Sequence, residues 1–305
     1  IRNRKTTNLN ESRGKIRMAK LGVIADGISQ NFEYALDVMN EFELEYAELQ
    51  FLWGKEVGDL NTAEMNKVKN LVNAHEVKVS CISRHIFGGL LIGEIQQDNS
   101  VYLEHLDALR RCIDMAKVLD CPLVRVMSFR KEMILFGSHG ANDWIVSEGA
   151  WDKLVSLMEL PTQIAEESGI TLVIETGNNA MVTSAHLARK LIDQLGTDRL
   201  KVLWDPCNSL YCNEKTYPDG YTLLRGHYLG HIHIKDAIVD IPKATVQFAA
   251  LNTGNMAAYL GDLANALRKD EYNGVISLES VYRPDGGSFE DGFRTSANIL
   301  KQLFA

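Results

Sequence analysis

The sequence lacks the features that mark membrane proteins, disulfide scaffolds and nucleic-acid-binding domains. It contains no run of about 18 apolar residues, so we expect no membrane-spanning helix. Its five cysteines include no CxxC pair and are odd in number, which indicates reduced thiols in a cytoplasmic protein rather than a disulfide framework. Asp and Glu outnumber Lys and Arg by 40 to 32, and the net charge of −8 argues against a surface that contacts nucleic-acid phosphates.

The chain also lacks a linker rich in Pro, Gly or Ser and shows no short internal repeat, so nothing divides its 305 residues into two domains. A barrel of alternating strands and helices needs about 250 residues. We therefore expect one domain over residues 18–305. Residues 1–17 are polar and basic and lack the apolar region of a secretory signal, so we expect them to form an N-terminal arm.

Short runs rich in Val, Ile and Leu alternate along the chain with segments whose apolar residues recur at helical spacing. This alternation implies a parallel sheet, and every long loop follows a strand. The runs predict strands at 18–26, 46–50, 77–83, 122–128, 172–175, 201–205, 229–234 and 274–279. The segments between them predict helices at 32–39, 62–75, 101–118, 151–168, 183–195, 221–227, 256–269 and 288–303. Eight of each predict an α/β fold, a single (β/α)8 TIM barrel.

Two predicted loops, 129–149 and 235–255, are longer than simple connectors, and such loops are commonly functional. We expect the first of them to form a lid or a contact surface. The apolar residues 134–136 within the first loop are a candidate subunit contact in a homo-oligomer, a dimer or a tetramer.

The last four predicted strands each end in a residue that can bind a divalent metal: Glu175, Asp205, His233 and Glu279. Side chains alternate along a strand, so each of these residues can share the inward face with an apolar or polar neighbour two positions earlier. The carboxyl ends of barrel strands meet at one mouth, where barrel enzymes carry their chemistry. One such residue alone is more often a helix cap or a hydrogen-bonded core residue. Four on successive strand ends predict a metal site, with His231 one layer deeper as a core residue.

The mixture of carboxylates and an imidazole suits Mn²⁺, Co²⁺, Mg²⁺ or Zn²⁺ and lacks the thiolates of a structural zinc site. A metal with open positions can bind two adjacent oxygens of a hydroxy-ketone or hydroxy-aldehyde and stabilise an enediolate. Two glutamates on opposite walls, Glu175 and Glu279, can then remove a proton from carbon and return it.

The stretches VIETG, LWDPCN, HIHIKD and NGVISLES resemble those of the xylose isomerase-like TIM-barrel family, and the similar layout runs from residue 18 to 303. That family includes sugar-phosphate isomerases and epimerases, ketose 3-epimerases, inosose-processing enzymes and type IV apurinic endonucleases. The resemblance implies one divalent metal, Mn²⁺ before the others, bound by Glu175, Asp205, His233 and Glu279. In the epimerase branch it also implies that the two glutamates are the catalytic acid/base pair.

The chain departs from the family pattern at two positions. The nuclease and several epimerase relatives carry His three residues after the metal-binding Asp, where this chain has Asn208. This weakens the case for a multi-metal nuclease site, and Asn208 becomes a candidate partner for a substrate hydroxyl. Ketose 3-epimerases carry Arg six residues after the ligand His, where this chain has Val239, so their substrate register does not carry over.

Further candidates for substrate contact lie at or just past strand ends: Glu48, Gln50, His85, Ser128, Arg130 and Lys235. The sequence therefore favours a metal-dependent isomerase or epimerase of a small sugar or sugar derivative. A metal-dependent dehydratase or decarboxylase of a keto-sugar or keto-acid is the alternative, because it uses the same intermediate. An apurinic endonuclease and a barrel without catalysis remain as weaker hypotheses. We expect a small carbohydrate as the partner, and neither a nucleic acid nor a membrane.

Overall fold

The computed structural model describes residues 19–131 and 149–305. The predicted N-terminal arm and most of the predicted loop 129–149, including residues 134–136, lie outside the described residues.

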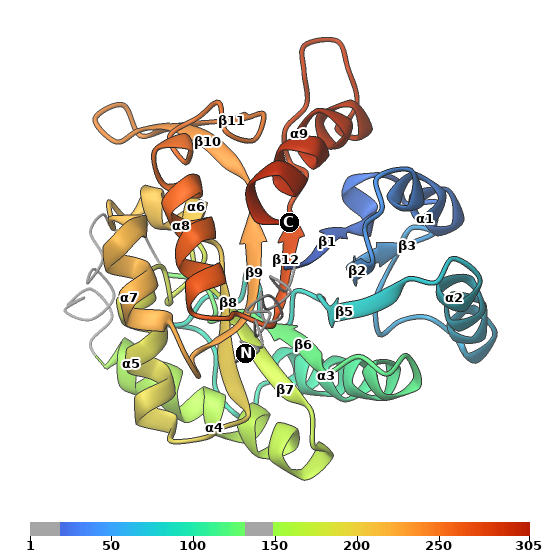
Figure 1. The fold of residues 1–305 in the computed structure, drawn as a ribbon. Helices are drawn as coiled ribbons and strands as arrows, with labels where there is room; N and C mark the ends of the chain where they lie inside the picture. Colours follow the sequence, from blue (N-terminus) through green and yellow to red (C-terminus); the bar gives the residue numbers. More distant parts are fainter. Residues whose placement is uncertain (1–18, 132–148) are drawn as a thin grey trace, which may run out of the picture.

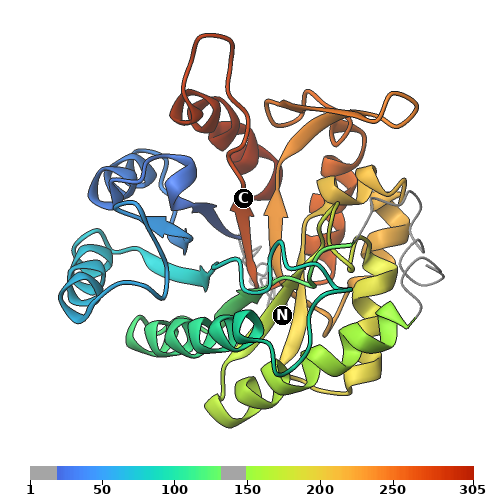
Figure 2. The ribbon, with the colours of Figure 1, turned by 180° about the vertical axis from the view of Figure 1, so that it is seen from behind.

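Eight parallel strands close into a barrel in the order β1-β12-β9-β8-β7-β6-β5-β2, which confirms the predicted TIM barrel. Figures 1 and 2 show the helices arranged as a ring around these strands. Each barrel strand falls within one of the predicted runs or within a residue of it. The strands are β1 Lys20–Ile24, β2 Tyr46–Leu49, β5 Lys78–Ile82, β6 Leu123–Val126, β7 Thr171–Glu175, β8 Leu200–Trp204, β9 Leu229–Ile234 and β12 Val275–Leu278.

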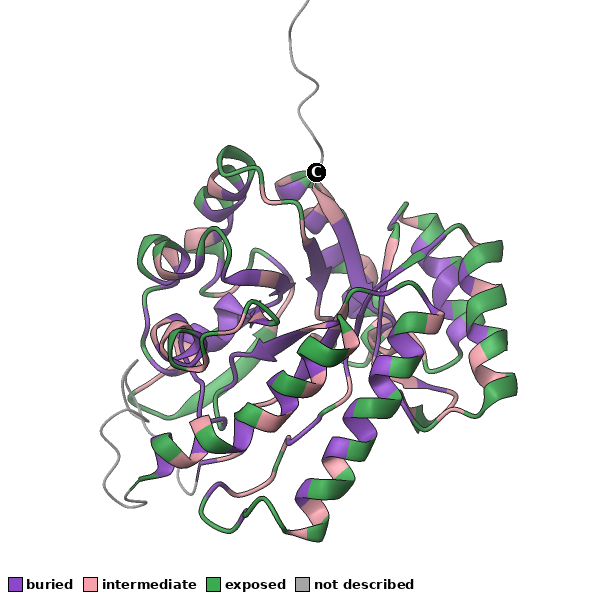
Figure 3. Ribbon diagram, turned by 90° about the horizontal axis from the view of Figure 1, so that it is seen from below, coloured by how far each residue is buried: buried purple, intermediate pink, exposed green. Residues whose placement is uncertain are grey.

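The predicted helices form at the expected places, because their apolar faces pack on the sheet while their polar faces stay exposed (Figure 3). Two of them, α2 and α9, begin with a capping box in which a side chain and a backbone N–H exchange hydrogen bonds. The helices are α1 Phe32–Glu41, α2 Thr62–Ala74, α3 Ser100–Val118, α4 Ala150–Ser168, α5 Ala185–Leu195, α7 Tyr221–Leu224, α8 Ala257–Lys269 and α9 Phe289–Phe304.

Some elements of the structure were not predicted from the sequence. A short hairpin, β3 Phe51–Leu52 with β4 Lys55–Glu56, follows β2. A one-and-a-half-turn helix, α6 Pro206–Tyr211, follows β8. The prediction of a loop over 235–255 is wrong, because most of that segment forms the hairpin β10 Asp236–Asp240 and β11 Thr245–Ala249.

The β10–β11 hairpin is fixed at its base by the carboxylate of Asp236. Its two oxygens accept hydrogen bonds from the backbone N–H of Gly254 and of Met256, at 2.8 and 2.9 Å. A Cβ at position 254 would lie 2.4 Å from Asp236 Oδ1, so only glycine allows this approach. The carboxylate therefore closes the segment into an ordered unit beside the end of β9.

The barrel interior changes from apolar to polar along its axis. Three buried residues, Cys81, Val173 and Leu203, form a small apolar cluster of their own inside the barrel. Two residues further along β7 and β8, the interior contains the buried carboxylates of Glu175 and Asp205 instead. Burying charged groups is costly unless they are paired, so this polar layer marks the end of the barrel where a function is expected. Among the described residues, no helix is both long and apolar enough to span a bilayer.

Candidate metal centre

The four side chains predicted as metal ligands lie together at the carboxyl ends of β7, β8, β9 and β12. Glu175 is the last residue of β7, His233 lies near the end of β9, and Asp205 and Glu279 directly follow β8 and β12. Each residue offers one ligand atom, and these atoms all lie within 4.8 Å of one another. The parallel barrel brings the four strand ends to one edge, so residues over 100 positions apart become neighbours.

Asp205 and His233 each use one of their two possible ligand atoms in hydrogen bonds within the protein, and the second atom of each makes no hydrogen bond. Asp205 Oδ1 caps helix α6 by accepting hydrogen bonds from the backbone N–H of Cys207 and Asn208. His233 Nε2 lies 2.9 Å from a carboxylate oxygen of Glu48. The other atoms, Asp205 Oδ2 and His233 Nδ1, are buried and have no hydrogen bond. Because a buried polar atom without a partner is costly, His233 Nδ1 fits a bound cation, and Asp205 Oδ2, which lies 2.6 Å from the ammonium of Lys235, also faces positive charge.

The two glutamates flank the imidazole of His233. Its Nδ1 lies 3.7 Å from Glu175 Oε1 and 3.6 Å from Glu279 Oε2. Three carboxylates and one imidazole nitrogen are the donor set that Mn²⁺, Co²⁺, Mg²⁺ and Zn²⁺ accept. The residues present therefore fit a divalent metal ion.

Each glutamate has its own cationic partner. Arg125, buried in the middle of β6, lies with its Nη1 2.9 Å from Glu175 Oε2. Lys235 Nζ lies 2.8 Å from Glu279 Oε2. It also approaches Asp205 Oδ2 to 2.6 Å, an ion contact whose direction is not that of a hydrogen bond. The negative charge of the site is thus balanced from two sides.

These charges shift the pKa values of the cluster. Burial alone would raise the pKa of Glu175, but Arg125 and His233 outweigh it and lower that pKa to about 2. Burial raises the pKa of Asp205 to about 7, against the opposing effect of Lys235. Burial would lower the pKa of Lys235, but Asp205 and Glu279 raise it well above its ordinary value, so the ammonium stays charged.

The buried carboxylate of Glu48 contacts two histidines of β9 inside the barrel. Glu48 Oε1 lies 2.9 Å from His233 Nε2, and Oε2 lies 2.7 Å from His231 Nε2. Ser83 donates a further hydrogen bond to Glu48, and Ser277 Oγ lies 3.1 Å from His231 Nε2. Burial would raise the pKa of Glu48, but the two imidazoles hold it well below its ordinary value.

Glu48 was predicted to contact substrate, but it is fully buried and both of its oxygens face histidines. Its geometry is that of a carboxylate that orients a metal-binding histidine. His231 lies one layer deeper than His233, as the alternation along β9 predicts.

The other predicted substrate contacts fall into two groups. Gln50 and His85 lie together at the mouth, with Gln50 Nε2 3.0 Å from His85 Nε2, and Lys235 lies among the ligands as described. The second group is engaged by backbone atoms. Ser128 Oγ accepts from the N–H of Val182 at 2.8 Å.

The two remaining residues of that second group donate to carbonyl oxygens. Arg130 Nε donates to Gly89 O at 3.3 Å, and Asn208 Nδ2 donates to Thr176 O at 2.7 Å. Both side chains therefore hold loops at the mouth in place.

Arg125 was missed from the sequence, although a signal was present. It interrupts the run LVRV of β6, whose three remaining residues are all apolar. A charge inside a buried strand must be paired, so it points to an acidic partner in the barrel. Glu56, described below, gave no such signal, because it lies in a hairpin that was not predicted.

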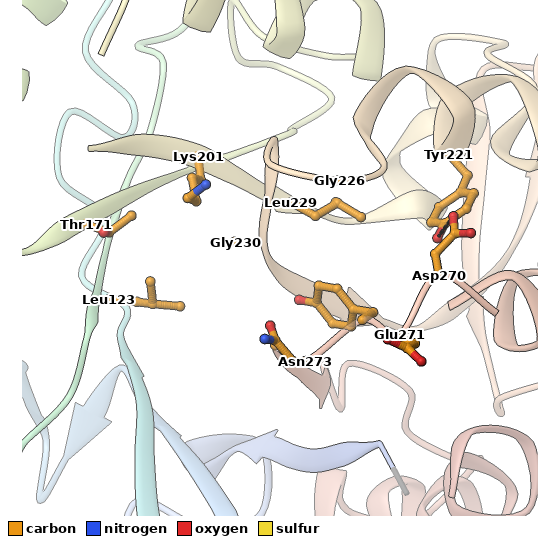
Figure 4. A pocket seen from close by; sticks show the side chains of 12 residues that line it. Leu123, Thr171, Lys201, Tyr221, Gly226, Leu229, Gly230, Asp270, Glu271 and Asn273 are labelled. Carbon is orange, nitrogen blue, oxygen red and sulfur yellow. Dashed lines mark hydrogen bonds between the residues drawn. The ribbon is translucent and has the colours of Figure 1, made fainter. Parts of the chain in front are cut away.

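A cavity of about 360 Å³ opens at the opposite end of the barrel (Figure 4). It is lined by the amino-terminal ends of β6, β7, β8 and β9 and by residues 270–274. Two of its polar side chains have protein partners: Tyr221 donates to Asp270 Oδ2 at 2.9 Å, and Lys201 donates to the carbonyl oxygen of the neighbouring His227. It lies away from the metal cluster, at the end of the barrel that serves stability rather than chemistry.

Several solved structures share this fold. A D-psicose 3-epimerase in the presence of D-fructose has a TM-score of 0.70 at 14% identity, over 93% of this chain and 99% of that one. The probable 3-DHS dehydratase AsbF from Bacillus anthracis has a TM-score of 0.69 at 14% identity, over 92% and 98% of the two chains. The IOLI protein with a binding zinc atom has a TM-score of 0.69 at 16% identity, over 94% and 99%. At these identities the similarity shows the fold.

No curated protein sequence matches the chain. The family model of the xylose isomerase-like TIM barrel matches residues 35–303, which is most of the chain. Other solved structures that share the fold include a 3-keto-D-glucoside 4-epimerase from E. coli and an L-ribulose 3-epimerase, at 16% and 14% identity. With the closed barrel and the four strand-end residues above, the match to the family model shows that the chain belongs to the xylose isomerase-like TIM barrel family.

Proposed function

We propose that the protein is a divalent-metal-dependent isomerase or epimerase of a small sugar or sugar derivative. The observation that carries this proposal is the position of Glu175 and Glu279 on two sides of His233 Nδ1, at 3.7 and 3.6 Å. A cation bound there supplies Lewis-acid stabilisation of negative charge on substrate oxygens. We expect Mn²⁺, with Co²⁺, Mg²⁺ or Zn²⁺ as alternatives.

The two glutamates then have complementary tasks. One carboxylate accepts a proton from the substrate carbon, and the electrons of that C–H bond move toward the neighbouring carbonyl to give an enediolate. The other glutamate returns a proton to carbon. Arg125 keeps Glu175 ionised, which suits Glu175 to accept the proton from carbon. The ammonium of Lys235, 2.8 Å from Glu279, supplies the proton that Glu279 passes to the other side of that carbon, and the proton held by Glu175 is released to solvent after turnover. Arg125 lies in β6 and Lys235 directly follows β9, and each contacts a different glutamate.

The substrate would lie between the metal position and the rim. Lys235, Gln50 and His85 have polar atoms at the mouth, and we assign them contacts with substrate oxygens. For Ser128, Arg130 and Asn208 the contacts with backbone atoms support a role in shaping the mouth. We also expect the enzyme to act in the cytoplasm, in keeping with its five free cysteines.

Solvent deuterium tests the proposed reaction. The metal-loaded protein is incubated in D₂O with a panel of ketoses and aldoses, and the products are followed by NMR. We expect a new isomer or epimer with deuterium at the carbon next to the carbonyl, and loss of turnover after chelation. A protein that binds metal but exchanges no carbon-bound hydrogen in any sugar would contradict the proposal.

A metal-dependent dehydratase is the second candidate. The contact of Lys235 Nζ with Glu279 at 2.8 Å places an ammonium beside an acid that could protonate a leaving hydroxyl. The fold shared with a probable dehydratase agrees with this possibility. Appearance of an unsaturated product with release of water, and no isomer, would favour it. For the endonuclease hypothesis, Asn208 in place of the expected His and the net charge of −8 are both unfavourable.

A further inference from the structure

A second polar cluster lies across the mouth from the metal ligands, on the side of β2 and β5. It is built around His85, which follows β5 and is 44% exposed in its side chain. The carboxylate of Glu56 accepts two hydrogen bonds from this one residue. Its Oε1 lies 3.0 Å from the backbone N–H and 3.1 Å from the ring Nδ1 of His85. A single oxygen thus fixes both the backbone and the ring.

The amide of Gln50 lies over the His85 ring. Gln50 Nε2 lies 3.0 Å from His85 Nε2 and 3.4 Å from His85 Nδ1, a position above the ring rather than on the in-plane lone pair of either nitrogen. Because the Glu56 carboxylate accepts at Nδ1, a neutral ring carries its proton there and keeps a free lone pair on Nε2. Gln50 directly follows β2, and its amide lies beside this lone pair at the mouth.

Glu56 is held in place by more contacts than a surface hairpin requires. Arg84 Nη2 lies 3.4 Å from Glu56, and Arg84 Nη1 lies 2.7 Å from Asp59. Arg84 also donates to Val57 O at 2.8 Å, and the N–H of Val57 donates to Gln50 O at 2.9 Å. Burial would raise the pKa of Glu56, but hydrogen bonds from His85 and the charge of Arg84 lower it to about 2. The orienting carboxylate is therefore ionised and immobile.

We propose that Glu56 is a positioning residue that fixes His85 as a hydrogen-bond acceptor for a substrate hydroxyl, with the Gln50 amide as the adjacent donor. This subsite takes the end of the substrate that lies away from the metal, and the inference rests on the proposed function. It selects an unphosphorylated, polyhydroxylated end. A phosphate there would meet the carboxylate of Glu56, and the nearby guanidinium of Arg84 is already engaged by Glu56 and Asp59.

The tautomer of His85 can be read without any substrate. In ¹⁵N NMR spectra of the full-length protein, we expect the neutral His85 ring to carry its proton on Nδ1. Glu56→Ala removes the acceptor and should give a mixture of tautomers, whereas Glu56→Gln keeps an accepting oxygen and should restore the Nδ1–H form. Asp37→Ala is the matched control, because Asp37 pairs with His75 at 3.1 Å on the outer surface. A proton on Nε2 in the unmodified protein would overturn the inference.

Steady-state kinetics then distinguish a role of His85 and Glu56 in substrate binding from a purely structural role. With the sugar that the metal-loaded enzyme converts best, His85→Ala should raise KM about tenfold, the effect of one lost hydrogen bond, and change kcat much less. Glu56→Ala should do the same with partial rescue by Glu56→Gln, and His75→Ala should do neither. The phosphorylated form of that sugar should be the poorer substrate. An unchanged KM in His85→Ala, or a preference for the phosphorylated sugar, contradicts the subsite.

The two proposals fail in different ways. If no sugar is converted and the four ligands bind no metal, the proposed function fails, and the tautomer still decides whether Glu56 sets the ring of His85. If metal binding and turnover are normal and only the His85 variants behave like the unmodified enzyme, the subsite alone is wrong. Metal affinity measured by calorimetry should be unchanged in every Glu56 and His85 variant.

Discussion

The two halves of the barrel mouth are built in different ways. On the side of β7, β8, β9 and β12, each functional group lies at a strand end and comes directly from the barrel. On the side of β2 and β5, the groups come from a small hairpin, a loop and the barrel interior, and each depends on a neighbour for its orientation. In the proposed function, the first half supplies the metal ligands, and the second half supplies their support and a rim for the substrate. We therefore expect changes in the first half to abolish the reaction, and changes in the second half to weaken it in graded steps.

The largest effect is expected for the two glutamates of the metal half. Glu175→Gln and Glu279→Gln should each lower kcat by about 10³, because each removes a proton-transfer group. The measurement is steady-state turnover with the metal content of each variant determined in parallel. Glu290→Gln, a surface change in α9, is the control. Turnover that survives in both glutamate variants would refute the acid/base pair.

Replacing Arg125 tests how much its buried ion pair with Glu175 contributes to the stability of the protein. Arg125→Met leaves Glu175 buried without its cation and should destabilise the metal-free protein by about 3–5 kcal/mol at pH 7, measured by urea unfolding. Arg110→Met, which breaks the exposed pair of Arg110 with Asp107, should cost almost nothing.

The pH dependence of the same variant has a defined sign. The pKa of Glu175 is lowered from 4.5 to about 2 in the folded protein. A lowered acid pKa contributes stability above the unfolded value, and this contribution is lost as the pH falls from about 4.5 to about 2. The stability difference between the unmodified protein and Arg125→Met should therefore shrink over that range. A constant difference would mean that Arg125 does not stabilise ionised Glu175.

A smaller effect is expected below the metal. Glu48→Gln keeps the shape of the side chain but removes the charge that orients His233, and metal affinity should fall about 10- to 100-fold. Isothermal calorimetry with Mn²⁺ measures this directly. Glu64→Gln, in the cap of α2, is the control. An unchanged metal affinity together with a raised KM would return Glu48 to the substrate contact that the sequence suggested.

The smallest effect is expected at Ser128. Its buried hydroxyl accepts from the backbone N–H of Val182, so Ser128→Ala should cost about 1 kcal/mol of stability and leave KM unchanged. Thermal unfolding and kinetics separate the two outcomes. A raised KM without loss of stability would show that the hydroxyl reaches the substrate.

The sequence predicted the barrel, and the meeting of the four candidate ligands at one edge, because both follow from local periodicity. Runs of Val, Ile and Leu give the strands, and parallel closure brings Glu175, Asp205, His233 and Glu279 to one edge without further information. Chain position alone therefore identifies these residues.

The opposite half was harder because its roles depend on contacts between distant segments. Strand alternation gives Glu48 an inward face but cannot distinguish a substrate contact from a support of His233. The β3–β4 hairpin has only two residues in each strand, too few for a periodic signal, so Glu56 was not found. The β10–β11 hairpin depends on the Asp236 carboxylate and Gly254, which meet only in the folded chain.

The central claim is that one divalent cation binds between the two glutamates at the carboxyl ends of the strands. Anomalous diffraction from crystals grown with Mn²⁺ tests it most directly. We expect one strong peak about 2.0–2.2 Å from ligand atoms of Glu175, Asp205, His233 and Glu279. A peak bound by other residues, or none among these four in crystals saturated with metal, would contradict it.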